Sequence, residues 1–282
     1  MVLEALINPV KAEKKPWELF FLGFLYTCVA MFISIQIFES NAGLIAVFLT
    51  VLACMPIFYA TIKYEEKKDT LNFPESLLLK EHTKALTSFV FMFLGIVGAF
   101  SIWYVLLPPV SAENIFSVQI ITINSINGVS GGFVANTHML SKVFLNNFKV
   151  LALCLLFSFF YGAGAIFILS WNASVISVAI GNFFRNTLGN YAHAVGFARV
   201  AAYFHVGSLS LLRYLVHGIP EILAYFVGSL AGGIISVAVI RHDFNTKHFR
   251  TILLDALDLS IIAVVILFFA SMIEVLVIPA FF

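Results

Sequence analysis

The feature that most constrains the fold is a series of long apolar segments, each able to cross a bilayer as one helix. The first, Trp17 to Phe38, holds 22 residues with a single charged side chain, Glu18. At about 1.5 Å per residue, a helix of this length covers the ~30 Å hydrocarbon layer. The whole chain is 61% hydrophobic and 11% charged, whereas soluble domains are about half apolar and a quarter charged. The sequence therefore predicts an all-α, polytopic membrane helix bundle surrounded by the lipid bilayer.

About seven transmembrane helices are predicted. They lie at residues 17–38, 43–62, 87–107, 148–169, 171–184, 221–240 and 251–279. Basic residues indicate their orientation, because cytoplasmic loops carry an excess of Lys and Arg. Residues 1–16, 63–86 and 241–250 hold eleven of the sixteen Lys and Arg, so we expect these three segments to be cytoplasmic. The N-terminus is therefore expected in the cytoplasm, and after seven crossings of the cell membrane the C-terminus is expected outside.

Residues 200–221 do not fit this count as a further span. Residue 171 and the basic segment at 241–250 are both expected inside, so an even number of crossings must connect them. We therefore expect a broken helix, in which Val200 to Val216 is re-entrant or interfacial on the outer side and Gly218 and Pro220 form the break. The alternative is that residues 171–240 are partly or wholly re-entrant and the number of spans differs.

Residues 63–86 are the most charged part of the chain. Five lysines and five acidic residues alternate there with leucines. This pattern predicts a cytoplasmic connector, either as a short amphipathic helix on the membrane surface or as a solvated loop. The span before it contains Pro56, which is expected to kink that helix.

Charge, cysteine spacing and the length of the first apolar segment argue against three further interpretations: nucleic-acid binding, a cysteine metal site and a signal peptide. A net charge of +1 and the lack of a basic patch with interleaved aromatic residues argue against a nucleic-acid partner. Cys28, Cys54 and Cys154 lie in apolar segments without metal-type spacing, and we interpret them as small buried hydrophobic residues. The first apolar segment is too long for a signal peptide and no small-residue cleavage site follows it, so it is predicted to be a span.

A group of ionisable residues at membrane depth is the main candidate for a site. It consists of Arg213, His217 and Glu221, with Asp255 and Asp258 on the last span. In a structural interpretation, Pro220 occupies the first turn of a helix and Glu221 lies at its positive N-terminus. In a transport interpretation, a broken helix exposes Arg213, His217 and Glu221 to a substrate or proton path that the two aspartates continue.

A metal site is a third interpretation of the same region. His193, His205, His217 and Glu221 would suit Zn²⁺, and a His-Glu pair with the two aspartates could hold a hard cation. A divalent metal ion is therefore the cofactor to consider. The histidines lie twelve residues apart, about 18 Å along one helix, so they could converge only through turns. The chain has no HExxH-type signature.

Small residues indicate where helices pack closely. The helix-packing positions predicted are Gly162, Gly164, Asn172, Gly181, Gly228 and Gly232. Gly228 and Gly232 have GxxxG spacing, which allows two helix backbones to approach each other. The partner helix is expected within the same chain, and the alternative is a homodimer contact.

Several of these motifs occur together in one known family. Asn146 and Asn147 open a span, and Asn172 and Ala173 form an Asn-small turn after a glycine-containing helix. His217, Gly218 and Glu221 form a His-Gly-x-x-Glu motif that precedes a helix rich in small residues. This combination resembles the stage II sporulation protein M family over residues 87–280. The family pattern usually has Asn-Gly where this chain has Asn172-Ala173.

The resemblance implies a domain division and a function. Residues 1–16 become a cytoplasmic N-terminus, 17–62 a two-helix addition to a five-span pattern, 63–86 a connector, and 87–280 the family domain. A family member is similar to a membrane scaffold that recruits cell-wall hydrolases, which implies membrane or envelope protein partners. We therefore expect a non-enzymatic membrane scaffold or assembly factor. The alternatives are a small-solute or ion transporter or channel, and an intramembrane metal-dependent enzyme.

Overall fold

The computed structural model describes residues 9–38, 41–69, 75–127, 136–161, 164–191, 193, 195–240 and 247–281. The described elements are all helical. They are α2 (Pro9–Lys14), α3 (Pro16–Ile37), α4 (Ala42–Asp69), α5 (Glu75–Leu106), α6 (Pro109–Ile115), α7 (Ser117–Asn127), α8 (Asn136–Tyr161), α9 (Ala165–Gly189), α10 (Phe197–Ile240), α11 (Lys247–Met272), the π-helix η1 (Ile273–Val277) and α12 (Ile278–Phe281). Seven helices in the described ranges are long and apolar enough to cross a membrane, which confirms the polytopic helix bundle.

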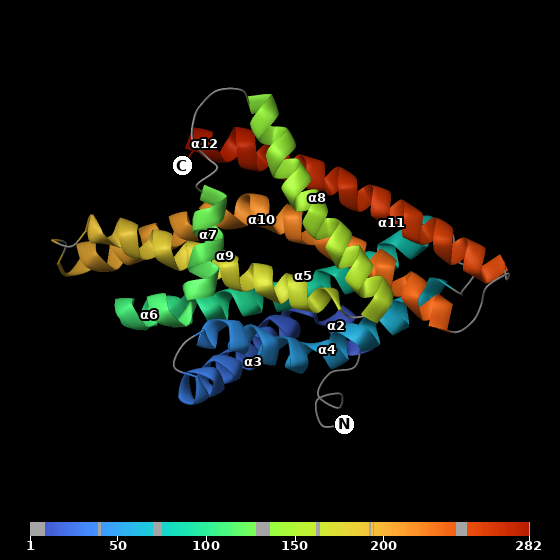
Figure 1. The fold of residues 1–282 in the computed structure, drawn as a ribbon, viewed down its shortest axis with the longest axis horizontal. Coiled ribbons are helices and arrows are strands. Elements are labelled where there is room, and N and C mark those ends of the chain that lie inside the picture. The colour runs from blue at the N-terminus through green and yellow to red at the C-terminus, as the bar shows by residue number, and fades with distance from the viewer. Residues whose placement is uncertain are drawn as a thin grey trace.

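Most of the long helices run roughly along one axis of the molecule, and α8 crosses them obliquely (Figure 1). The C-terminal end of α4, the start of α5, the end of α10 and the start of α11 lie at one end of the bundle. The end of α3, the start of α4, the end of α9, the start of α10 and the short helix α12 lie at the other end. The described parts of the segments predicted to be cytoplasmic are thus grouped at a single end, because an even number of spans separates each from the next: α3 and α4, then α5, α8, α9 and α10.

Two predicted spans have different bounds in the structure. Residues 148–169 do not form one helix, because α8 ends at Tyr161 and α9 begins at Ala165. The short segment 171–184 is the middle of α9, whose 25 residues are enough for a full span. The polar residues 185–189 continue this helix, so the end predicted at residue 184 from the change in polarity is five residues too early.

The predicted break near residues 200–221 is wrong. Phe197–Ile240 is a single helix of 44 residues, and both Gly218 and Pro220 lie inside it. Pro220 removes one backbone hydrogen bond, but neighbouring residues from Ile222 to Ala238 are almost continuously buried, and this packing stabilises the helix on that side. Gly218 faces Ile176 of α9 without a close contact. The helix therefore continues where local sequence signals predict an end.

The charged connector at residues 63–86 is also different from the prediction. α4 continues to Asp69, and residues 75–86 are the first three turns of α5 rather than a separate helix on the membrane surface. Glu65, Lys68 and His82 are buried, so this part is not a solvated loop.

The core forms where α4, α5 and α10 meet. The rings of Phe58 and Phe89 stack with centroids 4.3 Å apart, and Phe226 of α10 stacks on Phe89 at 5.5 Å. α3 and α5 approach so closely that a Cβ at Gly23 or Gly95 would overlap the backbone of the other helix. Small residues thus allow close backbone contact in a setting where lipid supplies little hydrophobic drive for helix association.

Candidate functional site

The polar residues near the middle of α10 are held by a neighbour one turn away. Tyr225 donates a hydrogen bond of 2.6 Å from its hydroxyl to Oε1 of Glu221. Tyr225 is completely buried, so its hydroxyl needs an acceptor inside the protein. Positions four apart lie on the same face of a helix, which explains why these two side chains meet.

A second carboxylate, from the C-terminal part of the chain, is close enough to this pair to interact with it electrostatically. Glu274 is in the π-helix η1, and its carboxylate interacts electrostatically with that of Glu221. The Asn147 side chain of α8 is within hydrogen-bonding reach of Glu274. Single π-helical turns often occur at functional sites because they shift the register of the side chains that follow. We call Asn147, Glu221, Tyr225 and Glu274 the carboxylate cluster; it joins α8, α10 and η1.

The sequence pointed to only part of this cluster. Asn147 and Glu221 belonged to the motifs noted above, but Glu274 and Tyr225 were not selected. The signal for Glu274 was available, since it is the only charged residue between positions 259 and 282. The signal for Tyr225 was its spacing of four from Glu221.

Arg213 and His217 extend the polar face of α10 by two turns. The Arg213 guanidinium lies over the ring of Phe183 in α9, 4.8 Å from its centroid. It is eight residues from Glu221, about 12 Å along the helix, and the ion pairs among the described residues do not include these two. Nδ1 of His217 is buried without a hydrogen-bond partner in the described part of the chain. The three residues therefore form a row rather than a compact site.

Asp255 and Asp258 are not part of this row. Glu274, the neighbour of Glu221, is 19 residues beyond Asp255, about 28 Å along the helix. The two aspartates are therefore near the opposite end of α11, and a path from Glu221 would have to cover this distance before reaching them.

The four residues considered for a metal are also separated. His193 is exposed next to the hairpin, and His205 is exposed and contacts the Tyr191 ring at 6.4 Å between centroids. His205 and Glu221 lie 16 residues apart on one continuous helix, about 24 Å along its axis. Within the described residues no group of three His, Cys, Asp or Glu has a geometry that could hold a metal ion.

The small residues have distinct positions. A Cβ at Gly228 would overlap the Leu151 side chain of α8, and a Cβ at Gly232 would overlap the Leu155 carbonyl, so the GxxxG surface packs within the chain. A Cβ at Gly181 would overlap the Tyr104 ring. Two positions differ from the prediction: Gly164 precedes α9 instead of lying inside a span, and Asn172 lies inside α9 and not at a turn. Gly162 lies outside the described residues, so the structure does not test it.

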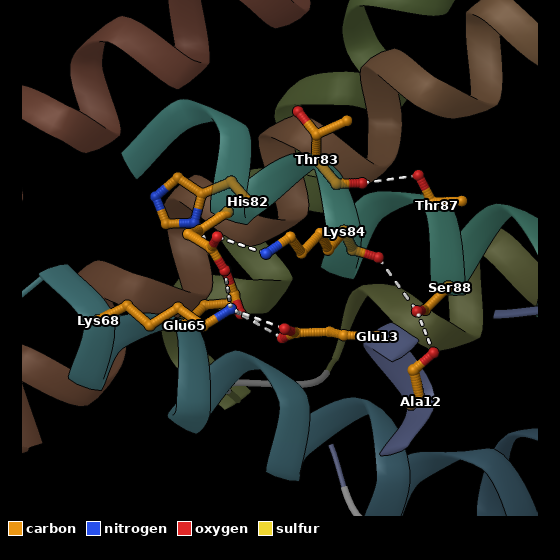
Figure 2. A network of polar contacts seen from close by, with 10 residues as sticks. Ala12, Glu13, Glu65, Lys68, His82, Thr83, Lys84, Thr87 and Ser88 are labelled. Carbon is orange, nitrogen blue, oxygen red and sulfur yellow. Dashed lines mark hydrogen bonds and ion pairs between the residues drawn. The ribbon is translucent and has the colours of Figure 1, made fainter. Parts of the chain in front are cut away.

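A buried ionic cluster lies at the end of the bundle that holds α2 (Figure 2). Nζ of Lys68 is 2.9 Å from Glu13 and 2.7 Å from Glu65. The other carboxylate oxygen of Glu65 is 2.8 Å from Nδ1 of His82. Ser88 on α5 donates a hydrogen bond of 3.0 Å to the Ala12 carbonyl, which fixes α2 beside α5. These contacts join α2, α4 and α5.

The charge balance of the ionic cluster affects Glu13. Burial raises the pKa of Glu13 from 4.5 to about 7, and the adjacent Glu65 carboxylate adds to this, while Lys68 opposes it. This cluster could not be predicted from the sequence, because the spacing of Glu65, Lys68 and His82 also suits a solvated helix surface. These side chains are shielded from water where α2, α4 and α5 pack together.

Arg185 closes the C-terminal end of α5. Its Nη2 donates hydrogen bonds to the carbonyls of Tyr104 at 2.5 Å and Val105 at 3.3 Å, and also to that of Leu107. Its guanidinium lies 4.9 Å from the centroid of the Tyr104 ring. The last carbonyls of a helix have no partner inside the helix, and a cation there also complements the helix dipole. Arg185 therefore fixes α9 against the end of α5.

One of three comparisons with known proteins found a match. Neither curated proteins nor solved structures gave a match. The family model described as Stage II sporulation protein M matches residues 87–279, more than half of the chain. The matched region begins within α5 and includes both Asn147 and the His217–Glu221 motif, which the carboxylate cluster connects in space. The chain is therefore a member of the stage II sporulation protein M family.

Proposed function

We propose that this protein is a non-enzymatic membrane scaffold whose α9–α10 hairpin binds another membrane protein. The observation that carries the proposal is an apolar stripe on α10. Phe197, Val200, Phe204 and Leu211 recur at intervals of three, four and seven residues and are all exposed, Phe197 at 86% and Phe204 at 75%. This spacing places them on one face of the helix, in the pattern of a seam between two helices.

The opposite face of the same segment is already occupied. Ala202, Val206 and Ser210 are buried at intervals of four, and Tyr203 contacts Phe184 of α9. One side of the N-terminal half of α10 thus packs on α9, and the other side remains exposed. Figure 1 shows that this hairpin extends beyond the neighbouring helices at its end of the bundle.

The length of α10 supports a role outside the hydrocarbon layer. Its 44 residues extend about 66 Å, roughly twice the ~30 Å that a span requires. The exposed stripe belongs to the half with few buried residues. A helix with an apolar seam in a partner membrane protein is the occupant that this spacing favours.

Site-specific crosslinking in the membrane tests the scaffold. A photoreactive residue at Phe204 is expected to give one crosslinked protein of defined mass. The same residue at Phe269, an exposed position on α11, is the matched control and is expected to give lipid adducts. The identified partner should then bind the purified wild-type chain and lose about tenfold in affinity for Phe204→Asp, because the substitution places a charge in an apolar seam. Lipid adducts alone at both positions would contradict the scaffold.

A transporter or channel is the second candidate, and the two neighbouring carboxylates of Glu221 and Glu274 favour it. Ionisable residues inside membrane proteins are costly and often belong to proton or ion paths. This candidate predicts that Glu221→Gln abolishes proton or cation flux in vesicles with little change in melting temperature. The scaffold predicts that Glu221→Leu lowers the melting temperature, because Tyr225 loses its acceptor, and that the wild type shows no flux. The third class, an intramembrane metalloenzyme, has no favouring observation in the described residues.

A further inference from the structure

A cavity lies between the end of α9 and the start of α10. It has a volume of about 260 Å³ and is lined by Arg185, Leu188, Gly189, Tyr191, Arg199, Ala202 and Tyr203. Two arginines and two tyrosines thus surround a space close to the lower limit of small-molecule sites, about 300 Å³. The lining residues include no acid. The lining residues therefore carry N–H and O–H donors and positive charge, while the stripe on the same segment of α10 is apolar.

The charged residues in the sequence around the cavity are all basic. Residues 114–220 contain Lys142, Lys149, Arg185, Arg199 and Arg213 and not a single Asp or Glu. Glu113 of α6 acts electrostatically on Tyr104, the ring beneath Arg185, but it does not line the cavity. An anion entering the cavity therefore meets attraction from both arginines without competition from a carboxylate in its walls.

The two arginines have different surroundings. Arg185 is fixed by the carbonyls at the end of α5, and these bonds use Nη2 alone. Arg199 is exposed, and no ion pair in the described ranges involves it. A cavity lined by one guanidinium that is held in place and by another without an ion pair among the described residues suits a phosphate group, whose oxygens accept paired hydrogen bonds from Arg.

We propose that this cavity binds a phosphate group, either from the headgroup of an anionic lipid or from a soluble phosphorylated molecule. Arg185 and Arg199 hold the phosphate oxygens, and the Tyr191 and Tyr203 hydroxyls supply further donors. The exposed side chains of Val200 and Phe204 lie on the same segment and provide an apolar surface for acyl chains in the lipid case. The residues that would hold the phosphate are different from the stripe proposed to bind a partner protein, whereas in the lipid case Val200 and Phe204 would be shared between the two.

Binding measurements on the full chain test the site. The probes are inorganic phosphate added to protein in neutral detergent, and nanodiscs containing either phosphatidylglycerol or only phosphatidylcholine. The variant is Arg199→Gln, because among the described residues the Arg199 side chain has no ion pair that would be lost. Lys142→Gln is the matched control; it removes an exposed positive charge from the same acid-free segment, away from the cavity. Thermal stabilisation and retention of lipid in native mass spectrometry are measured.

Each outcome either distinguishes a lipid headgroup from a soluble phosphorylated ligand or contradicts the proposed phosphate site. Stabilisation by phosphatidylglycerol only, weakened about tenfold or more in Arg199→Gln and unchanged in Lys142→Gln, assigns the site to a lipid headgroup. The same dependence on Arg199 with inorganic phosphate only assigns it to a soluble ligand, and a response to both probes assigns it to phosphate in either form. Equal responses of Arg199→Gln and the wild type to every probe overturn the proposal. These results do not depend on crosslinking at Phe204.

Discussion

Glutamates in the described part of the chain are shielded from water in different ways, as three of them show. Glu65 lies between two bases, Lys68 and His82, which satisfy both of its oxygens. Glu13 shares Lys68 with Glu65 and is therefore the less well compensated of the two. Glu221 is held by a hydroxyl group and has a second carboxylate as its neighbour. The free energy of burying a carboxylate depends on such partners, so these positions should respond differently to pH and mutation.

Glu13 should make stability depend on pH. The folded protein holds its proton up to about pH 7, whereas an exposed glutamate releases it near 4.5. Between these values the folded state binds more protons than the unfolded state, so this contribution to stability is complete below pH 4.5 and is lost as pH rises through 7. We expect the apparent melting temperature to fall from pH 5 to pH 8, by an amount corresponding to ~1–3 kcal/mol.

The variant Glu13→Gln isolates this effect. Gln stays neutral at every pH, so the slope between pH 5 and pH 8 should flatten. Glu113→Gln changes an exposed glutamate and serves as the control, which should retain the wild-type slope. A slope unaffected by Glu13→Gln would show that another group causes the pH dependence.

Arg185 should matter for stability through geometry as well as charge. Arg185→Gln removes the cation at the end of α5 and leaves the Tyr104, Val105 and Leu107 carbonyls without these donors, at a cost of about 1–3 kcal/mol. Arg185→Lys keeps the charge but not the planar guanidinium, so it should recover only part of the loss. Arg213→Gln removes a stacked cation without such bonds and should cost less. Thermal melting of the three variants in detergent gives this order, and equal losses would contradict it.

At the scale of single elements, α10 combines two different surfaces in one helix. Its C-terminal half is buried among α4, α5, α8 and α11, while its N-terminal half packs on α9 and remains exposed on the other side. Local signals at Gly218 and Pro220 predicted two elements. They failed because proline costs one hydrogen bond, whereas the packing of the residues after it keeps the helix intact. Sequence patterns report local cost but not the tertiary contacts that offset it.

Glycines on α10 provide a graded test of its packing. A Cβ at Gly232 would meet the Leu155 backbone, which cannot easily move, whereas one at Gly228 would meet the flexible Leu151 side chain. Gly232→Ala should therefore destabilise the protein by about 1–3 kcal/mol, and Gly228→Ala by less. Gly207→Ala is the control on the same helix: its Cβ would have only an ordinary contact of 3.7 Å with Phe184, and the better helix propensity of Ala should leave stability equal or higher. A neutral Gly232→Ala would argue against the close contact of α10 with α8.

At the scale of the whole molecule, the number of helices could be predicted more reliably than their bounds. Seven apolar helices follow from hydropathy, since lipid requires each span to satisfy its backbone hydrogen bonds internally. The predicted bounds differ from the observed ones where a helix continues into polar sequence, as at residues 185–189 and 63–69. The candidate site was predicted in part. Asn147 and Glu221 could be found as motifs, but Glu274 joins them only after α8, α10 and η1 have packed.

The orientation of the bundle can be tested with single cysteines. The native Cys54 and Cys154 are buried and Cys28 is half-buried, so the wild type should react weakly with a membrane-impermeant maleimide. Cysteines at the exposed positions Lys14 and Arg250 should be labelled from the same side, and one at Asn190 from the opposite side. In intact cells only Asn190→Cys should react, because the basic segments near Lys14 and Arg250 are expected in the cytoplasm. Labelling of Arg250→Cys but not Asn190→Cys in intact cells would reverse the orientation, and the cavity between α9 and α10 would then face cytoplasmic rather than external phosphate groups.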